Sequence, residues 1–206
     1  PILMYPGNAG GTNWGGVSVD PVRQTLIANM SIVGFVVTLI PRDQVDAVKQ
    51  KEPKAEIGPQ NGTPYAARRE TLLSSIQLPC NPPPWGTLTA VDLNNGNIKW
   101  QIPFGTVRDI APVPLPINYG VPNLGGPVTT ASGLIFIAAA LDNYIRAYDI
   151  ETGKELWKGR LPAGGQATPM TYRLRKDSKQ FVVIAAGGHG RAGTKIGDSL
   201  IAYALP

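Results

Sequence analysis

The chain has 206 residues, of which 43% are hydrophobic and 16% are charged. This is enough for one domain with a buried core and too apolar for a disordered chain. The 24 glycines and 20 prolines favour frequent turns and exclude a helical bundle. The formal net charge is +5, but no run of lysine and arginine is interleaved with aromatic residues, so we expect no nucleic-acid partner.

Single features exclude further classes. Cys80 is the only cysteine, so neither an internal disulfide nor a cysteine-based zinc site can form. The most apolar run, Ile32–Ile40, is far too short to cross a bilayer, and its β-branched residues predict a buried strand. The sequence begins at Pro1 with no leader segment, and we interpret it as part of a longer protein.

In chain order, the first predicted elements are two short strands, Gly16–Asp20 and Gln24–Asn29, which pair about a turn at Pro21. The strand within residues 32–40 follows. Residues 42–84 are polar and rich in proline, and we expect them to form an insertion on the rim of the domain. The charged residues of this insertion are interpreted as a solvated face.

A repeated unit then dominates the sequence. Residues 88–100 read LTAVDLNNGNIKW and residues 145–157 read IRAYDIETGKELW, with Asp92 and Asp149 57 residues apart. Each copy predicts a β-hairpin whose turn glycine has positive φ and whose aspartate accepts hydrogen bonds from turn amides. Trp100 and Trp157 are predicted to be buried against a neighbouring unit. Residues 199–205 repeat only the first strand, as expected for a terminal copy.

Further short strands are predicted between these copies, at Pro127–Thr130, Leu134–Ala139, Thr168–Tyr172 and Phe181–Ala185. Four short strands per repeat are typical of a β-propeller blade. The sequence therefore predicts an all-β fold of about three blades, with residues 1–206 forming the C-terminal part of one propeller domain. A closed propeller needs at least four blades, so the others come from missing sequence, which we favour, or from associating chains.

The residues 188–193 form a G-x-G-x-x-G sequence after a predicted strand. No room remains for the helix and the acidic residue that a dinucleotide site needs, so we expect no nucleotide there. The same loop contains His189, the only histidine, which is either structural or in contact with a ligand. A nucleophile elbow and a second metal-binding histidine are both missing, so neither a hydrolase nor a zinc enzyme is supported.

A second glycine-rich loop, residues 7–16, contains Asn13 and Trp14 just before a predicted strand. This loop is either a flexible connection between blades or a wall at the mouth of the ring that contacts a ligand. The residues alone leave both interpretations open.

With these residues in view, the chain resembles the pyrroloquinoline quinone (PQQ) dependent dehydrogenases. The two A-x-D-x-x-x-G-x-x-x-W segments are similar to the tryptophan-docking motifs of that family's eight-bladed propeller. Other segments resemble the membrane-bound branch that acts on glucose or on quinate and shikimate: residues 14–21, 78–80, 84–86, 124–127 and 159–172.

The resemblance implies a cofactor site in the central funnel. It implies PQQ and a calcium or magnesium ion as cofactors, a sugar or cyclic polyol as substrate, and ubiquinone as electron acceptor. It places Gly188 and His189 against PQQ, with Asp142 on a neighbouring blade. It places Asn13, Trp14 and Asn29 in the segment that supplies an amide contact to the cofactor. The catalytic aspartate and the metal ligands of the family lie in earlier blades. We therefore expect residues 1–206 to be inactive alone.

The resemblance also implies a location on the periplasmic side of the bacterial inner membrane, with the anchor in a missing N-terminal region. Which polyol is oxidised stays open. The rival hypothesis is a non-enzymatic propeller scaffold with similar repeats, in which the polar, glycine-flanked loop around His189 would have no purpose.

Overall fold

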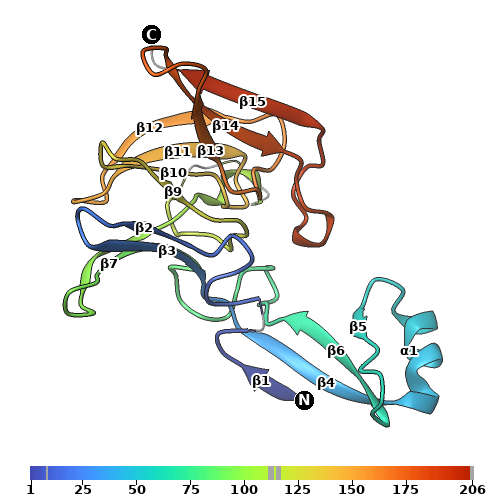
Figure 1. The fold of residues 1–206 in the computed structure, drawn as a ribbon. Coiled ribbons are helices and arrows are strands. Elements are labelled where there is room, and N and C mark those ends of the chain that lie inside the picture. The colour runs from blue at the N-terminus through green and yellow to red at the C-terminus, as the bar shows by residue number, and fades with distance from the viewer. Residues whose placement is uncertain (8, 111–113, 115–116, 205–206) are drawn as a thin grey trace. The chain divides into compact units, whose positions relative to one another are not determined.

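The computed structural model describes residues 1–7, 9–110, 114 and 117–204 (Figure 1). Within these ranges the strands are accompanied by one α-helix, α1 (Val45–Lys51), and by short 3₁₀ turns. The chain divides into two compact units: unit 1 contains Pro1–Gly10 and Ile32–Pro82, and unit 2 contains Gly11–Ser31 and Pro83–Pro206. None of the helices in the described ranges is long and apolar enough to span a membrane.

Unit 2 contains three antiparallel sheets, which follow one another along the chain (Figure 1). The first blade has the order β2-β3-β7-β8, the second β9-β10-β11-β12 and the third β13-β14-β15. The bounds are β2 (Val17–Asp20), β3 (Thr25–Ser31), β7 (Gly86–Asp92), β8 (Ile98–Pro103), β9 (Val128–Thr129), β10 (Leu134–Ile137), β11 (Tyr144–Asp149), β12 (Glu155–Arg160), β13 (Met170–Arg173), β14 (Gln180–Ala186) and β15 (Ser199–Ala204). The predicted all-β fold of about three blades is confirmed.

The turns that close the outer hairpins match the repeated motif. Gly96 and Gly153 have φ of 76° and 70°, a region that side chains with a Cβ rarely adopt. Asp92 and Asp149 each accept a hydrogen bond from the amide two residues later, at 2.9 and 3.1 Å. Asp20 makes the same contact, at 2.9 Å, in the turn between β2 and β3. The aspartate turn therefore occurs three times, once more than the sequence motif indicated.

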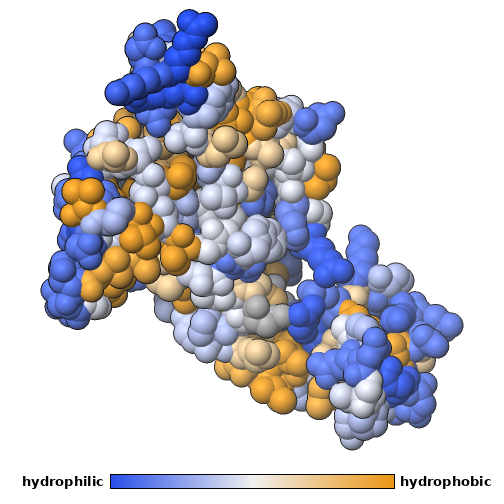
Figure 2. All heavy atoms as spheres, in the orientation of Figure 1, coloured by the Kyte–Doolittle hydropathy of each residue, from blue (hydrophilic) through white to orange (hydrophobic). Residues whose placement is uncertain are grey.

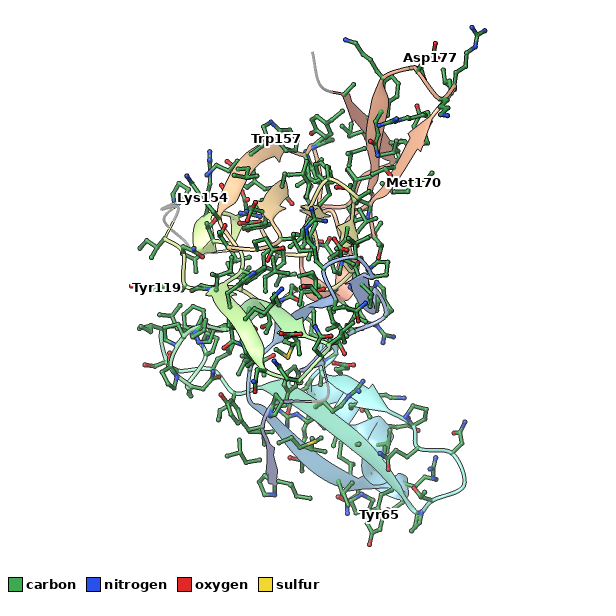
Figure 3. The ribbon with its side chains drawn as sticks, turned by 60° about the vertical axis from the view of Figure 1, so that its left-hand side comes forward. Tyr65, Tyr119, Lys154, Trp157, Met170 and Asp177 are labelled. Carbon is green, nitrogen blue, oxygen red and sulfur yellow. The ribbon has the colours of Figure 1, made fainter. Side chains whose placement is uncertain are left out.

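The two motif tryptophans join consecutive blades. The Trp100 indole donates a hydrogen bond to the carbonyl of Ile150, at 2.9 Å, and its ring fills the space where Gly153 has no side chain. Trp157 packs edge-on against Tyr203 of the third blade, with ring centroids 4.9 Å apart. Both rings contact a neighbouring blade as predicted, but Trp100 is only half-buried and Trp157 is 39% exposed, so the expectation of burial is wrong for both residues (Figure 3).

The core of unit 2 follows the middle strands of each blade. Ile27 and Leu88 of the first blade and Ile135 and Ile145 of the second are fully buried, and Ile184 of the third is 1% exposed. The outermost strands β8 and β12 are mainly exposed. These middle strands are buried along most of their length, and the polar side chains that they contain, such as Asn29 and Thr89, are buried with them.

Unit 1 combines the first ten residues with the segment between β3 and β7, two strands that pair directly with each other over seven residues. Its sheet has the order β1-β4-β6-β5, formed by β1 (Ile2–Met4), β4 (Phe35–Pro41), β6 (Tyr65–Thr71) and β5 (Glu56–Gly58). The unit thus includes β1 and β4 as well as most of the predicted insertion at 42–84. Apolar side chains of β1 lie at its surface, where Ile2 and Leu3 are 59% and 64% exposed (Figure 2).

The apolar run Ile32–Ile40 forms the strand β4, as predicted, but it is not a buried strand. Ile40 is buried, whereas Leu39 is 47% exposed and the others of β4 are half-buried. A small four-stranded sheet has too few elements to cover both of its faces. Asn8 of the predicted glycine-rich loop and Leu205 of the third repeat lie outside the described residues.

Candidate functional site

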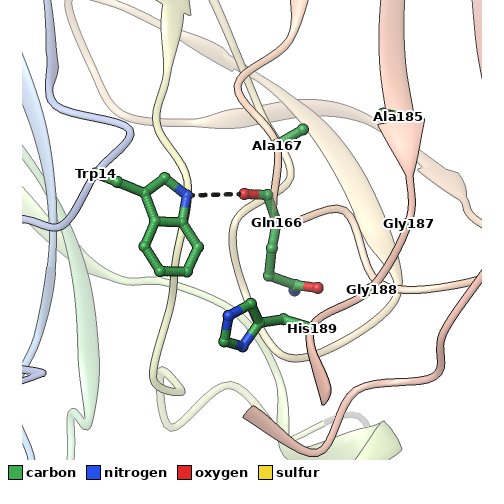
Figure 4. Close-up of a pocket in the computed structure, with 7 residues that line it drawn as sticks. All are labelled: Trp14, Gln166, Ala167, Ala185, Gly187, Gly188 and His189. Atoms are coloured by element: carbon green, nitrogen blue, oxygen red, sulfur yellow. Dashed lines mark hydrogen bonds between the residues drawn. The ribbon is translucent and has the colours of Figure 1, made fainter. Parts of the chain in front are cut away.

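A pocket of about 240 Å³ opens in unit 2 where three loops meet (Figure 4). The loops are the segment before β2, the connection from β12 to β13, and the connection from β14 to β15. The residues that line the pocket are Trp14, Gln166, Ala167, Ala185, Gly187, Gly188 and His189. Three of the residues predicted from sequence, Trp14, Gly188 and His189, are therefore brought together although they are far apart in the chain.

Trp14 is positioned by close packing of backbone against backbone. A Cβ on Gly15 would lie 1.9 Å from the carbonyl carbon of Gly125, so only glycine lets the two segments approach. The Trp14 indole donates a hydrogen bond to the carbonyl of Gln166, at 3.4 Å (Figure 4). Its amide donates to the Asn13 side chain, at 2.9 Å. Trp14 remains 59% exposed, so it presents an aromatic surface to the pocket.

His189 faces Trp14, with ring centroids 5.1 Å apart and an angle of 41° between the planes. Its Nδ1 accepts a hydrogen bond from the amide of Ala192, at 3.2 Å, in the 3₁₀ turn η3 (Gly190–Ala192). An accepting Nδ1 carries no proton, so the neutral ring carries its proton on Nε2, which can donate to a ligand. The two rings therefore offer an aromatic surface and one directed donor.

The glycines of the same loop shape the wall of the pocket. Gly188 has φ of 68°, and a Cβ there would lie 2.0 Å from the carbonyl oxygen of Lys195. The G-x-G-x-x-G sequence leads only into the three-residue turn η3 and then into β15. This local structure agrees with the expectation that the loop is not a dinucleotide fingerprint.

Asn29 lies beneath the loops and is 1% exposed. Its Nδ2 donates to the side chain of Asn123, at 2.7 Å, and to the carbonyl of Gly125, at 3.1 Å. Its Oδ1 is buried and has no hydrogen-bond partner among the described residues. A Cβ on Gly125 would lie 2.6 Å from the carbonyl oxygen of Gln166, so Asn29 supports the segment against which the pocket is built.

Asp142 is not among the residues that line the pocket. It is fully buried and accepts hydrogen bonds from Arg146, at 2.8 Å, and from the amide and hydroxyl of Thr106, at 2.7 and 2.9 Å. Burial lowers the pKa of Arg146, but the hydrogen bond and charge of Asp142 raise it more, so the guanidinium stays protonated. Asp142 thus ties β11 of the second blade to the segment that leaves the first.

Sequence reasoning missed two buried side chains at the pocket: Gln166, which lines it and is 5% exposed, and Thr194, which lies behind Gln166 and is 8% exposed. The Thr194 hydroxyl donates a hydrogen bond to the side-chain oxygen of Gln166, at 3.0 Å. Neither stands in a motif that signals binding. A polar side chain directly after two glycines, in Gly164-Gly165-Gln166, was the only available hint.

The donor set suits a flat aromatic ligand that carries oxygen acceptors. Trp14 offers a stacking surface, His189 offers the Nε2 proton, and Gly187 and Gly188 allow close approach of the backbone. The same set does not suit a metal ion, because no group of three or more His, Cys, Asp or Glu side chains comes together within the described part of the chain.

Comparison with known proteins gives a consistent result. A family profile described as "Glucose/ethanol/alcohol dehydrogenase, beta-propeller domain", with the short name PQQ, matches residues 1–182. Quinoprotein glucose dehydrogenase of Escherichia coli (strain K12) is 50% identical over 99% of this chain and 27% of its own length. Quinate/shikimate dehydrogenase (quinone) of Acinetobacter baylyi is 39% identical over 98% of this chain and 26% of its own length.

Solved structures show the same fold. The chain of a europium-containing methanol dehydrogenase superposes with a TM-score of 0.64 at 21% identity, over 99% of this chain and 35% of that one. This chain spans about a quarter of the length of the curated relatives that it matches.

Proposed function

The chain belongs to the β-propeller family of PQQ-dependent glucose, ethanol and alcohol dehydrogenases, and from this premise we propose that its blades form one wall of a PQQ pocket in a dehydrogenase that oxidises a sugar or a cyclic polyol. The observation that carries the proposal is the convergence of Trp14, Gly188 and His189 on one pocket. When bound, PQQ accepts two electrons from the alcohol carbon of a substrate.

Each pocket residue has a defined part in this proposal. Trp14 stacks on the flat face of the ligand, because its ring is exposed and its indole nitrogen is already held by Gln166. His189 donates its Nε2 proton to a ligand oxygen, because Nδ1 is occupied by the Ala192 amide. The wall at Gly187 and Gly188 has no side chains, so one edge of a planar ligand can approach the backbone closely.

The other predicted site residues take supporting parts. We assign Asn29 to the base of the cofactor region, where its unpartnered Oδ1 is available as an acceptor. Asn13 stays a candidate for the amide contact, since its oxygen receives the Trp14 amide and its nitrogen is not used by that bond. Asp142 is assigned a positioning part, because both of its oxygens are already engaged by Arg146 and Thr106.

Three components lie outside these residues in the proposal. The calcium or magnesium ligands and the catalytic carboxylate belong to other blades of the same propeller, which the relatives' greater length accommodates. Ubiquinone is the proposed electron acceptor, and the proposed location is the periplasmic side of the inner membrane. The scaffold alternative is not favoured, since the relatives at 39% to 50% identity are dehydrogenases.

The test is a titration of PQQ into the full-length apoprotein in the presence of calcium, followed by dye reduction with glucose and with quinate. Wild-type protein should bind PQQ and reduce the dye with one of the two substrates. His189→Ala should weaken PQQ binding by about tenfold, the effect of losing one buried hydrogen bond to a charged or strongly polar acceptor.

Lys195→Ala is the matched control, because Lys195 is exposed on the same loop and does not line the pocket. It should bind PQQ like the wild type. Absence of PQQ binding by wild-type protein would contradict the proposed function. Equal affinities of wild type and His189→Ala would remove His189 from the site and leave the family assignment intact.

A further inference from the structure

A continuous chain of hydrogen bonds runs behind the pocket and connects three segments. The Gln166 Nε2 donates to the carbonyl of Ala140, in the connection between β10 and β11 of the second blade, at 3.1 Å. The Thr194 hydroxyl donates to Gln166 Oε1, at 3.0 Å, and accepts the amide proton of His189, at 2.7 Å. The loop that carries His189 is thereby linked to the second blade.

The direction of each bond in this chain is determined by its neighbours. Because Gln166 uses its nitrogen for Ala140, its oxygen must face Thr194. A hydroxyl has one proton, so Thr194 gives that proton to Gln166 and receives the amide proton of His189 on its oxygen. Both side chains are buried, and replacing either group by an apolar one leaves a buried partner unsatisfied.

The same glutamine also holds the second ring of the pocket. The carbonyl oxygen of Gln166 accepts the indole proton of Trp14, while its side chain reaches the His189 loop through Thr194 (Figure 4). Gln166 therefore fixes Trp14 through its backbone and His189 through its side chain. Gln166 thus connects the two rings, whose centroids are 5.1 Å apart, directly to Trp14 and through Thr194 to the backbone of His189.

We propose that Gln166 and Thr194 are positioning residues, which hold the imidazole of His189 in register with the indole of Trp14 so that the two together receive the flat cofactor. The inference rests on the proposed function, because it assigns the ring pair to PQQ. Thr194 acts through His189, and Gln166 acts on both rings. Neither side chain reacts with the substrate.

The test uses the full-length apoprotein and measures PQQ affinity by quenching of tryptophan fluorescence. Thr194→Val keeps the shape of the side chain and removes its hydrogen bonds to Gln166 and His189, so PQQ affinity should fall about tenfold. Thr194→Ser keeps the hydroxyl and should restore the affinity to within about twofold of the wild type.

A control separates positioning from general stability. Thr89 is 2% exposed and accepts a side-chain hydrogen bond from Gln101, at 2.9 Å, in the first blade away from the pocket. Thr89→Val should lower the thermal midpoint of the apoprotein to the same extent as Thr194→Val but leave PQQ affinity unchanged. Equal losses of affinity in the two valine variants would overturn the inference.

A double-mutant cycle shows whether Thr194 acts through His189. In the His189→Ala background, Thr194→Val should change PQQ affinity by less than about twofold, since no imidazole remains to be positioned. Additive losses would contradict the proposed connection. Should Thr194→Val not fold, Gln166→Met serves instead, because it removes the oxygen that accepts the Thr194 proton and keeps the backbone carbonyl that holds Trp14. PQQ affinity should again fall about tenfold, and an unchanged affinity would contradict the inference.

The outcomes distinguish the inference from the function on which it rests. Wild-type protein that does not bind PQQ removes the proposed function. Wild-type protein that binds PQQ, together with a Thr194→Val variant of unchanged affinity, removes the positioning role alone.

Discussion

The junction between the first and second blades and the junction between the second and third blades use the same tryptophan motif in different surroundings. Trp100 lies against the turn that follows β11, with its indole bonded to Ile150 and its ring over Gly153. Trp157 meets only the edge of the Tyr203 ring among aromatic side chains and is 39% exposed. The motif therefore places the tryptophan at the junction, and the residues of the following blade determine how completely its ring is packed.

The rest of each junction differs in kind as well. At the first, Glu151 lies 3.4 Å from Arg23 and 3.5 Å from Lys99, so charged side chains join the hairpin ends of two blades. At the second, the contact is an apolar cluster of Ala138, Ile145, Leu161, Ala163, Val182, Ile184 and Ala186. Exposed ion pairs contribute little to stability, so the tryptophan contact should dominate the outer part of the first junction.

The largest difference should come from removing the rings. We expect Trp100→Ala to lower the free energy of unfolding by about 3 kcal/mol and Trp157→Ala by about half as much, because the second ring loses less buried area. Chemical denaturation of the two variants measures both values. Equal losses of unfolding free energy in the two variants would contradict this expectation and would show that Trp157 is covered as fully as Trp100.

A smaller effect should come from the turn glycines. Gly153→Ala should destabilise the protein by about 2 kcal/mol for two reasons. The alanine would have to adopt a positive φ, and its Cβ would lie 2.8 Å from the Trp100 ring. Gly96→Ala is the matched control, with positive φ and nothing within 4 Å of the new Cβ. It should cost about 1 kcal/mol by backbone strain alone. If both variants lose the same amount, the close contact between Gly153 and Trp100 contributes nothing.

The smallest effect should be a dependence on acid. Hydrogen bonds from the Thr152 side chain and amide lower the pKa of Asp149 below the usual value of an aspartate. The stability gained from this lowered pKa is fully present above pH 3.8 and is lost as the pH falls through the folded-state value. Asp149→Asn should therefore show a flatter decline of unfolding free energy below about pH 4 than the wild type.

The turn of the first blade provides the comparison for this titration. Hydrogen bonds from the Asn94 amide and side chain lower the pKa of Asp92 in the same way, but no described tryptophan packs on Gly96. Protonation of Asp149 should loosen the turn on which Trp100 packs, so acid should shift Trp100 fluorescence before the protein unfolds globally. Asp149→Asn should abolish this early shift, and Asp92→Asn should retain it. An early shift that survives in Asp149→Asn would separate this turn from the tryptophan.

Local sequence was sufficient for the hairpins. Asp92, Gly96 and Trp100 lie within nine residues, so spacing alone predicts the turn that they form. The partner of Trp100 was not predictable as a contact, because Ile150 is 50 residues away. The burial of Ile32–Ile40 was overestimated, because a strand's hydrophobicity does not reveal how many elements cover it.

The pocket shows where sequence reasoning is weakest. Trp14 and His189 stood out by their chemistry, whereas Gln166 and Thr194 are ordinary polar residues whose importance comes from partners 152 and 28 residues away. Asp142 was singled out by the family resemblance, but the structure places Arg146 and Thr106 around it. Only the fold determines whether a buried carboxylate faces a ligand or a neighbouring guanidinium.

The seven-residue pairing of β3 with β7 has a consequence for protein engineering. Residues 32–85 leave the sheet at Ser31 and return opposite it at Gly86, so the ends of the excursion are fixed by the sheet itself. The entropy cost of closing a loop grows only slowly with its length. This position in the blade is thus a natural graft point, where a short hairpin loop or a foreign module can replace residues 32–85, provided that β1, which pairs with β4, is removed with them.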